Sequence, residues 1–274
     1  MKTHILKVAF GFLLSGLVSA DVVSIRSDVW YPINGEPGSS KPGYMIELAK
    51  SILAEHGHAV DYEVLSWKGS LTMVRRGEYD CIVGAGHDDA PDFIFSKKPW
   101  GVIKAQFYVK RYSSWRYTGI PSLANTKVGV IGDYSYSKDL DAYIARSAES
   151  SIEVEILDKK VQVVRANNAL RQNIGKLLTG LIDTTVAFDM VMASRLKELD
   201  LVGQIKTAGE LEDFDDGSIY IACSPNKPSS KRYIELFTTG IDKMRSNGRL
   251  QQILDKYGLT DWEYSTEETS DSSL

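Results

Sequence analysis

Cysteine and histidine are scarce in this chain. Its 274 residues include only two cysteines, Cys81 and Cys223, and four histidines, and no Cys-x-x-Cys pair occurs. A zinc framework or a small, densely cross-linked domain is therefore not indicated. The Gly-x-Ser-x-Gly motif of serine hydrolases is absent as well. These absences argue against the enzyme classes that such motifs mark, and no other feature of the sequence favours catalysis.

Long apolar runs are equally scarce. The one clear example, residues 8–18, follows Lys2 and Lys7 and is too short to span a bilayer. It ends at Val18-Ser19-Ala20, small residues that typically precede signal cleavage. We therefore expect residues 1–20 to be a secretory signal peptide and the protein to reside in the periplasm. No cysteine stands at the cleavage point, which disfavours a lipoprotein.

Basic charge is also low. Lys2 and Lys7 leave with the signal, so about 254 residues remain, with 30 basic and 36 acidic side chains and a net charge of −6. No basic patch is visible, which argues against a nucleic-acid partner. A chain of this length is enough for two modest domains or one large one.

Both cysteines lie in strand-like runs, "DCIVGA" and "IYIACS". Export permits a disulfide, but the favoured interpretation is two separate buried thiols.

Strand-like runs alternate with helical patterns along the chain. The alternation favours α/β lobes whose sheets carry helices on both faces. It restarts near residue 112, which indicates a second lobe. Ligands of such sheets bind beyond the carboxyl ends of strands, so the informative loops are 28–36, 66–69, 84–92, 132–137 and 188–190.

Three stretches carry a resemblance to a known family. They are "SDVWYPING" with "GYMIELAKSIL", then "WKGSLTMVRRGEYDCIVGAG", then "SPNKPSSKRYIELFTTGIDKMRSNGRLQQILDKYGL". Across residues 21–260 the chain resembles the extracytoplasmic solute-binding proteins of the polar-amino-acid type, bacterial family 3. The resemblance implies a two-lobed periplasmic-binding-protein fold of type II, with two mixed sheets hinged by two strand crossovers.

The expected lobe boundaries follow from the resemblance. Lobe 1 is expected at residues 21–108 and 216–260, and lobe 2 at 112–212, with crossovers near 108–112 and 212–217. Residues 261–274 are polar and acidic and are expected to be a disordered tail.

The resemblance implies a monomer that captures a small polar solute in the interlobe cleft for an inner-membrane ABC permease, without a cofactor or metal. Three alternatives stay open: an enzyme on the same scaffold, resembling a dehydratase; a ligand-presenting partner of a membrane sensor; and a partner protein with a degenerate cleft.

Several first-lobe residues match ligand-contacting positions of the family. Tyr31 and Trp67 are expected to form aromatic walls, with Asp28 contacting polar groups of the ligand. Trp30 stands beside Tyr31, so one ring should face the core and the other the cleft. Arg26 is a charge inside an apolar strand, and it either pairs with a structural carboxylate or points into the cleft.

The loop "GAGHDDAPDF" departs from the family pattern. Gly84, Ala85 and Gly86 are expected to offer backbone contacts, and His87 takes the place of a hydroxyl residue. Asp92 stands where the family has an arginine that binds the ligand's α-carboxylate, so that clamp is missing.

The second lobe departs as well. Phe188 replaces the acidic residue that holds the ligand's ammonium, although Asp189 is adjacent. Tyr134 and Ser135 lie at the start of a helix, a place that suits a carboxylate or phosphate.

The two departures predict a cationic or hydrogen-bond-donating ligand in place of a standard amino acid. The competing interpretation is a solvated surface loop whose aspartates cap turns. A metal site built from His87, Asp88, Asp89 and Asp92 is the least favoured reading.

Overall fold

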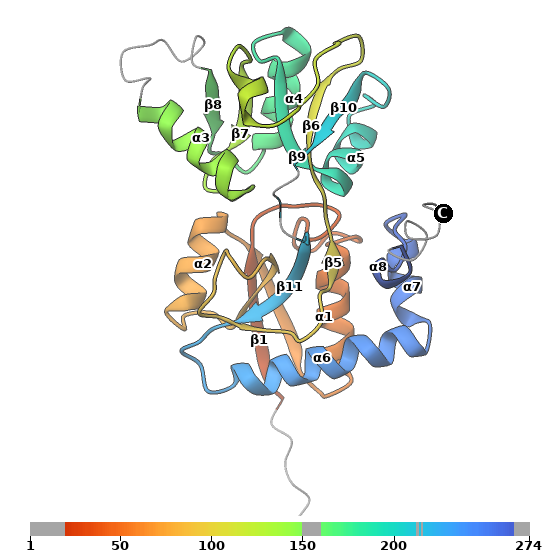
Figure 1. The fold of residues 1–274 in the computed structure, drawn as a ribbon. Coiled ribbons are helices and arrows are strands. Elements are labelled where there is room, and N and C mark those ends of the chain that lie inside the picture. The colour runs from red at the N-terminus through yellow and green to blue at the C-terminus, as the bar shows by residue number, and fades with distance from the viewer. Residues whose placement is uncertain (1–19, 150–159, 212–213, 215, 266–274) are drawn as a thin grey trace, which may run out of the picture.

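The computed structural model describes residues 20–149, 160–211, 214 and 216–265. The expected signal peptide, apart from Ala20, and the end of the acidic tail lie outside these residues. Two α/β lobes lie one above the other, and both ends of the described chain belong to the lower lobe (Figure 1). Among the described helices, none is both long and apolar enough to cross a membrane.

The lower lobe is a mixed sheet in the order β2-β1-β3-β11-β4, with β5 paired to β11. Its strands β1, β2 and β3 are parallel, and β11 runs antiparallel to β3. The strands are β1 (Val22–Ser27), β2 (Ala59–Val64), β3 (Cys81–Ala85), β4 (Ile94–Phe95), β5 (Gly101–Val102) and β11 (Ser218–Cys223). The helices are α1 (Tyr44–Ala54), α2 (Trp67–Arg75), α6 (Ser230–Ser246), α7 (Arg249–Asp255) and α8 (Trp262–Ser265).

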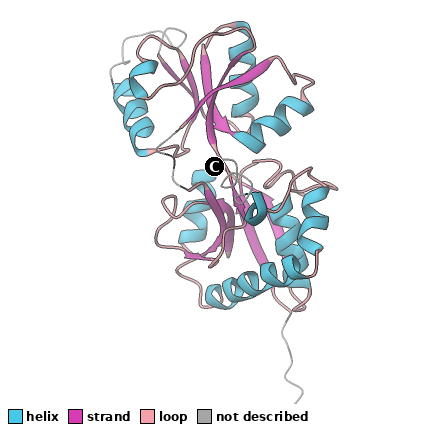
Figure 2. Cartoon of the chain, turned by 45° about the vertical axis from the view of Figure 1, so that its right-hand side comes forward, coloured by secondary structure: helices cyan, strands magenta, loops and turns pink. Residues whose placement is uncertain are grey.

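The upper lobe is a second mixed sheet in the order β10-β6-β9-β7-β8. Helices flank both faces of each sheet, as Figure 2 shows. The strands are β6 (Ala105–Lys110), β7 (Val128–Ile131), β8 (Val161–Val164), β9 (Thr184–Phe188) and β10 (Ile205–Glu210). The helices are α3 (Lys138–Glu149), α4 (Ala169–Thr179) and α5 (Asp189–Glu198), with a 3-10 turn at Ile120–Leu123.

Apolar faces explain why these elements assemble. In α1, residues at helical spacing are fully buried against the lower sheet, among them Met45, Leu48, Ile52 and Leu53. Such burial stabilises a domain by about 25 cal/mol for each Å² of apolar surface removed from water. The fold class predicted from the sequence, two mixed sheets in a two-lobed type II architecture, is confirmed.

The chain passes between the lobes twice, and the two passages run side by side. The backbone N–H of Ile103 donates to Gly217 O at 2.9 Å, and that of Leu211 donates to Ala105 O at 2.9 Å. β6 begins at Ala105 and pairs with β9 and β10 in the upper sheet, so the first crossing falls at residues 103–104. The first crossing is therefore earlier than the expected 108–112. The alternation of buried and exposed residues predicts a strand, but it does not reveal which sheet that strand joins.

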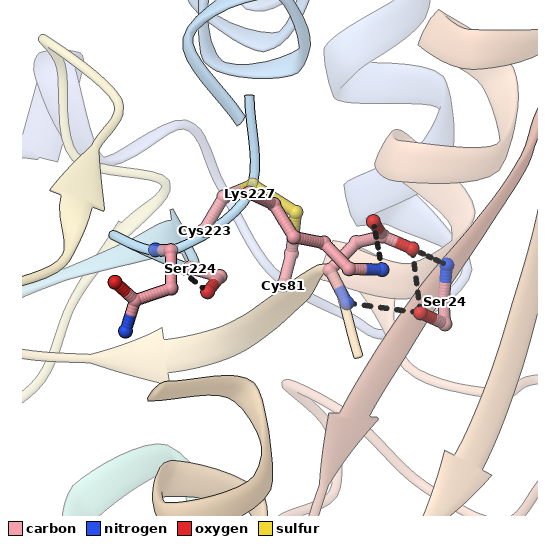
Figure 3. The surroundings of a disulfide bond; sticks show 7 residues. Ser24, Cys81, Cys223, Ser224 and Lys227 are labelled. Carbon is pink, nitrogen blue, oxygen red and sulfur yellow. Dashed lines mark hydrogen bonds and ion pairs between the residues drawn. A yellow bond between two sulfur atoms is a disulfide. The ribbon is translucent and has the colours of Figure 1, made fainter. Parts of the chain in front are cut away.

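Cys81 and Cys223 form a disulfide, so the prediction of two separate thiols is wrong. The residues stand directly opposite each other on β3 and β11, although 142 positions separate them in the chain. That pairing is non-local and could not be read from either run alone. Figure 3 shows Ser24 and Lys227 beside the disulfide. Both bind Asp80, which accepts hydrogen bonds from Ser24 and pairs with Lys227 at 2.8 Å.

The disulfide closes a loop that contains the whole upper lobe. Replacing both cysteines by alanine (C81A/C223A) should lower the free energy of unfolding by roughly 2–5 kcal/mol, since the unfolded chain regains freedom. Urea unfolding with and without reductant measures this, and the variant itself should not respond to reductant. If the wild-type protein, unfolded without reductant, shows two reactive thiols, the disulfide is absent and the expected loss of stability is wrong.

Candidate functional site

The connections that follow β1, β2, β7, β8 and β9 meet between the lobes and line a cavity of about 180 Å³. A smaller compartment of about 40 Å³ adjoins it and includes Gly84 of β3 and Asp89 of the connection that follows. Five side chains line both spaces and therefore stand at their junction: Asp28, Trp30, Trp67, Tyr134 and Phe188. The first three come from the lower lobe and the last two from the upper lobe.

A hydrogen bond joins the lobes at the centre of this site. The Tyr134 hydroxyl donates to Asp28 Oδ2 at 2.5 Å. Burial raises the pKa of Asp28 from its ordinary value of 3.8 to about 6, against the opposing effect of the Tyr134 hydrogen bond, and the nearby Asp89 charge raises it further. Burial also raises the pKa of Tyr134, so the phenol remains a neutral donor. The site thus holds a carboxylate that is poorly solvated and incompletely neutralised.

Aromatic rings enclose that carboxylate. Trp30 meets Phe188 edge-on at a centroid distance of 5.0 Å and Tyr134 at 6.3 Å. Phe188 in turn stacks on Tyr136 at 6.0 Å. These rings supply apolar contact area and negative π faces that attract cations.

Gly84 makes room for the central ring. Its φ of +81° lies in the left-handed region, and a Cβ there would come within 3.1 Å of the Trp30 ring. Only glycine meets both demands without strain. The position lines the small compartment.

Asp89 supplies the second carboxylate of the small compartment. Its Oδ2 accepts a hydrogen bond from the Gly86 backbone N–H at 2.8 Å, and its side chain is also hydrogen-bonded to Trp67. Burial raises the pKa of Asp89, whereas these two hydrogen bonds lower it. The sequence indicates Asp89 only as one donor of the least favoured metal site. Its place in the cleft follows from the tight turn after β3.

Asp92 does not face the cleft, contrary to the expectation for the clamp position. Arg75 binds it with two hydrogen bonds of 2.8 and 3.0 Å, and this pairing lowers the pKa of Asp92. The Arg75 guanidinium also lies 5.0 Å above the Phe93 ring. The surface-loop interpretation thus applies to Asp92, while Asp89 turns inward.

His87, Ser135 and Tyr31 lie in other interlobe hollows. His87 is exposed and packs on Phe95 and Tyr220, at centroid distances of 4.2 and 4.7 Å. It lines a hollow that Ser135 shares, and Ser135 also reaches the small compartment.

Trp30 lines the central cavity, whereas Tyr31 lines a separate hollow between the lobes. Tyr31 packs on Tyr257 at 5.8 Å and lines a separate hollow beside α5. Trp67 lines the central cavity as expected.

The remaining expected residues serve the scaffold. Ala85 is buried in the lower core. Asp189 Oδ1 accepts from the backbone N–H groups of Met190 and Lys104, at 2.7 and 3.2 Å, so it ties the start of α5 to the first crossing. Arg26 pairs with Asp61 at 2.7 Å and lies 4.1 Å above the Tyr79 ring, which decides its role in favour of a structural ion pair.

The sequence does not predict the part of the cavity wall at residues 165–171, which includes Arg165 and Arg171, nor Arg195. Arg165 directly follows β8, and Arg171 lies in the first turn of α4. Both line the larger cavity. The rule that ligands bind beyond the carboxyl ends of strands would have found Arg165, had the strand at 161–164 been recognised.

A solute-sized cavity between two α/β lobes joined by two crossings defines a periplasmic-binding protein of type II. The chain belongs to the bacterial extracellular solute-binding proteins, family 3, whose sequence profile matches residues 27–260. No curated protein sequence matches the chain.

Solved structures show the same fold at low sequence identity. An ancestral arginine-binding protein bound to arginine is 18% identical, with a TM-score of 0.67 over 87% of this chain and 98% of that one. The amino acid ABC transporter substrate-binding protein AbpA from Streptococcus pneumoniae, bound to L-arginine, is 20% identical, with a TM-score of 0.64 over 86% and 94%. A histidine kinase sensor domain with similarity to periplasmic binding proteins is 17% identical, with a TM-score of 0.67 over 86% and 96%.

Asp28 should make stability depend on pH. Because its folded pKa is raised to about 6, the folded state holds the proton more tightly than the unfolded state does. Stability therefore falls as pH rises from about 4 to about 6, and the ionised group costs roughly 1–3 kcal/mol above that window. Asp28→Asn should remove this cost and raise the free energy of unfolding at pH 7.5, with little change at pH 4.

Asp92→Asn is the matched control, measured by urea unfolding at the same two pH values. Its pKa is lowered by Arg75, so its stabilising effect is present above about pH 4 and lost as pH falls. The control should therefore be destabilised at pH 7.5, by less than about 1 kcal/mol for an exposed pair. An Asp28→Asn variant less stable than the native protein at pH 7.5 would show that Asp28 is not destabilising.

Proposed function

We propose that the protein is a periplasmic binding protein that captures a small polar solute between its lobes for uptake by an inner-membrane ABC permease. The observation that carries this proposal is Asp28, a poorly solvated carboxylate at the lobe junction, enclosed by Trp30, Trp67, Tyr134 and Phe188. The protein acts as a monomer and needs neither a cofactor nor a nucleic acid.

The solute presents a cationic or hydrogen-bond-donating group to Asp28 and Asp89. A cation there gains the attraction of two carboxylates and stacks on aromatic faces, worth roughly 0.5–2 kcal/mol for each well-placed ring. A standard amino acid bound in the family manner is disfavoured, since Asp92 at the clamp position is turned away and Asp189 is engaged at the hinge.

Lobe closure is the step that couples binding to recognition by the permease. In the structure the lobes already touch through the Asp28–Tyr134 hydrogen bond and the Trp30–Phe188 contact. A ligand that bridges the same side chains favours the closed state by its differential affinity for it. A membrane sensor is the second candidate partner for the closed form, and the resemblance in fold to a histidine kinase sensor domain is compatible with such a partner.

One observation also fits an enzyme. A carboxyl group with a pKa of about 6 beside a phenol donor is suited to acid–base work, and Asp28 and Tyr134 meet that description. The binding protein is the stronger proposal because the same features follow from enclosing a cation. Incubation of bound solutes with the protein, followed by NMR, tests this, and conversion of any solute would favour the enzyme.

Ligand identity can be approached without assuming a class. Mass spectrometry of small molecules that co-purify with the protein comes first. A thermal-shift screen of amines, quaternary amines, polyamines, organic acids and the twenty amino acids follows. A ligand at about 100 times its dissociation constant should add roughly 2.7 kcal/mol of stability. Micromolar binding of an α-amino acid that lacks a side-chain cation, with no amine bound, would contradict the proposed recognition.

Trp30→Ala should weaken the binding of any hit by about 3- to 30-fold, the range expected when one cation–aromatic contact is lost. Tyr31→Ala is the matched control, because that ring lies in a separate hollow beside α5. It should change the affinity by less than about twofold. Isothermal titration calorimetry measures both, and the reverse pattern would show that the ligand occupies the Tyr31 hollow.

A further inference from the structure

Charge is segregated along the interlobe cavity. The small compartment is lined by Asp28 and Asp89, and no basic side chain is among its described lining residues. The larger cavity is lined by four basic side chains against two acidic ones, Asp28 and Asp133. The basic residues are Lys68, Arg165, Arg171 and Arg195.

Two of the four cations are best placed to bind an anion. Arg195 is engaged by Glu198 at 2.5 Å, and Lys68 lies on the opposite lobe in the first turn of α2. Arg165 forms an ion pair with Asp133 at 3.6 Å, but its side chain is 65% exposed, so the guanidinium keeps donors that can reach an anion. Arg171 is likewise exposed in the first turn of α4. Arg165 and Arg171, which we call the arginine pair, thus form a positive pole on the upper lobe.

The two poles lie in adjoining compartments. Both compartments are lined by Asp28, Trp30, Trp67, Tyr134 and Phe188, so a ligand that reaches from one pole to the other would lie against these side chains. The small compartment, at about 40 Å³, has room for a group the size of an ammonium head. The larger cavity, at about 180 Å³, takes the rest of a small solute.

We propose that the ligand is an extended zwitterion, with its cationic group at Asp28 and Asp89 and its anionic group at the arginine pair. This polarity is the inverse of the one that the family resemblance implies, in which the first lobe holds the carboxylate and the second holds the ammonium. The inference rests on the proposed binding function and adds the chemical class of the ligand.

The separation of the poles selects the ligand's length. In an α-amino acid both charged groups are attached to one carbon, so they cannot occupy separate compartments. In an ω-amino acid or a betaine of similar length, a flexible chain lies between the charges and can pass the aromatic junction. Lysine carries an additional α-ammonium, which would face the arginine pair and be repelled.

Three related probes separate the effect of the ligand's carboxylate from the effect of an α-ammonium. ε-Aminocaproate carries both charges, pentylamine lacks the carboxylate, and lysine adds the α-ammonium. Shorter homologues, γ-aminobutyrate and δ-aminovalerate, together with glycine, test the length. We expect calorimetry at neutral pH to show that one of the ω-amino acids binds more tightly than pentylamine, lysine and glycine by about tenfold or more, the effect of one charge-assisted contact.

The double variant R165Q/R171Q tests the positive pole directly. It should lose about tenfold or more in affinity for the best ω-amino acid and keep its affinity for pentylamine within about twofold. The matched control is R116Q/R146Q, which removes the same charge from exposed upper-lobe positions. It should leave both affinities unchanged, and retained pentylamine binding shows that the variants are folded.

The outcomes distinguish this inference from the proposed function. If pentylamine binds as tightly as every ω-amino acid, or if R165Q/R171Q binds the best of them like the native protein, the extended zwitterion is wrong and the cation-binding proposal stands. If no amine, zwitterion or other solute of the screen binds, the proposed function fails with it. Tighter binding of lysine than of ε-aminocaproate would also overturn the inferred polarity.

Discussion

The site depends on a carboxylate that two lobes bury together. Asp28 directly follows β1 of the lower lobe, and Tyr134 of the upper lobe donates to it across the cleft. Burial raises the pKa of Asp28 to about 6, so the group is costly to ionise where it stands. A single neutral phenol does not offset that cost, whereas a bound cation can. The unliganded protein thus keeps an unfavourable charge at the place where its ligand is expected.

The two crossings of the chain between the lobes bring Asp28 and Tyr134 together. Two adjacent crossings, tied by backbone hydrogen bonds at Ile103 and Leu211, join the lobes beside the cavity. The disulfide between Cys81 and Cys223 holds together the parts of the lower lobe that precede and follow the upper lobe.

In the loop after β3, the aspartate that faces the cleft is not the one at the family's clamp position. Its tight turn directs Asp89 toward Trp67 and the small compartment, while Asp92 pairs with Arg75 on the surface. Phe188, at the position of the family's acidic residue, packs against Trp30 and Tyr136. Positive charge at Arg165 and Arg171 appears on the opposite side of the cavity. The polarity of the cleft therefore differs from the polarity that the family resemblance implies.

The sequence by itself determined the fold class, the two lobes and most of the loops that meet in the cleft, because strand–helix alternation and local turn residues are encoded over short distances. Only the tertiary structure decided which neighbouring side chain faces inward: Trp30 over Tyr31, and Asp89 over Asp92. It likewise decided the disulfide, the sheet that β6 joins and the ion pair of Arg26 with Asp61. Each of these rests on contacts between distant segments or on the exact course of a turn, which residue spacing does not specify.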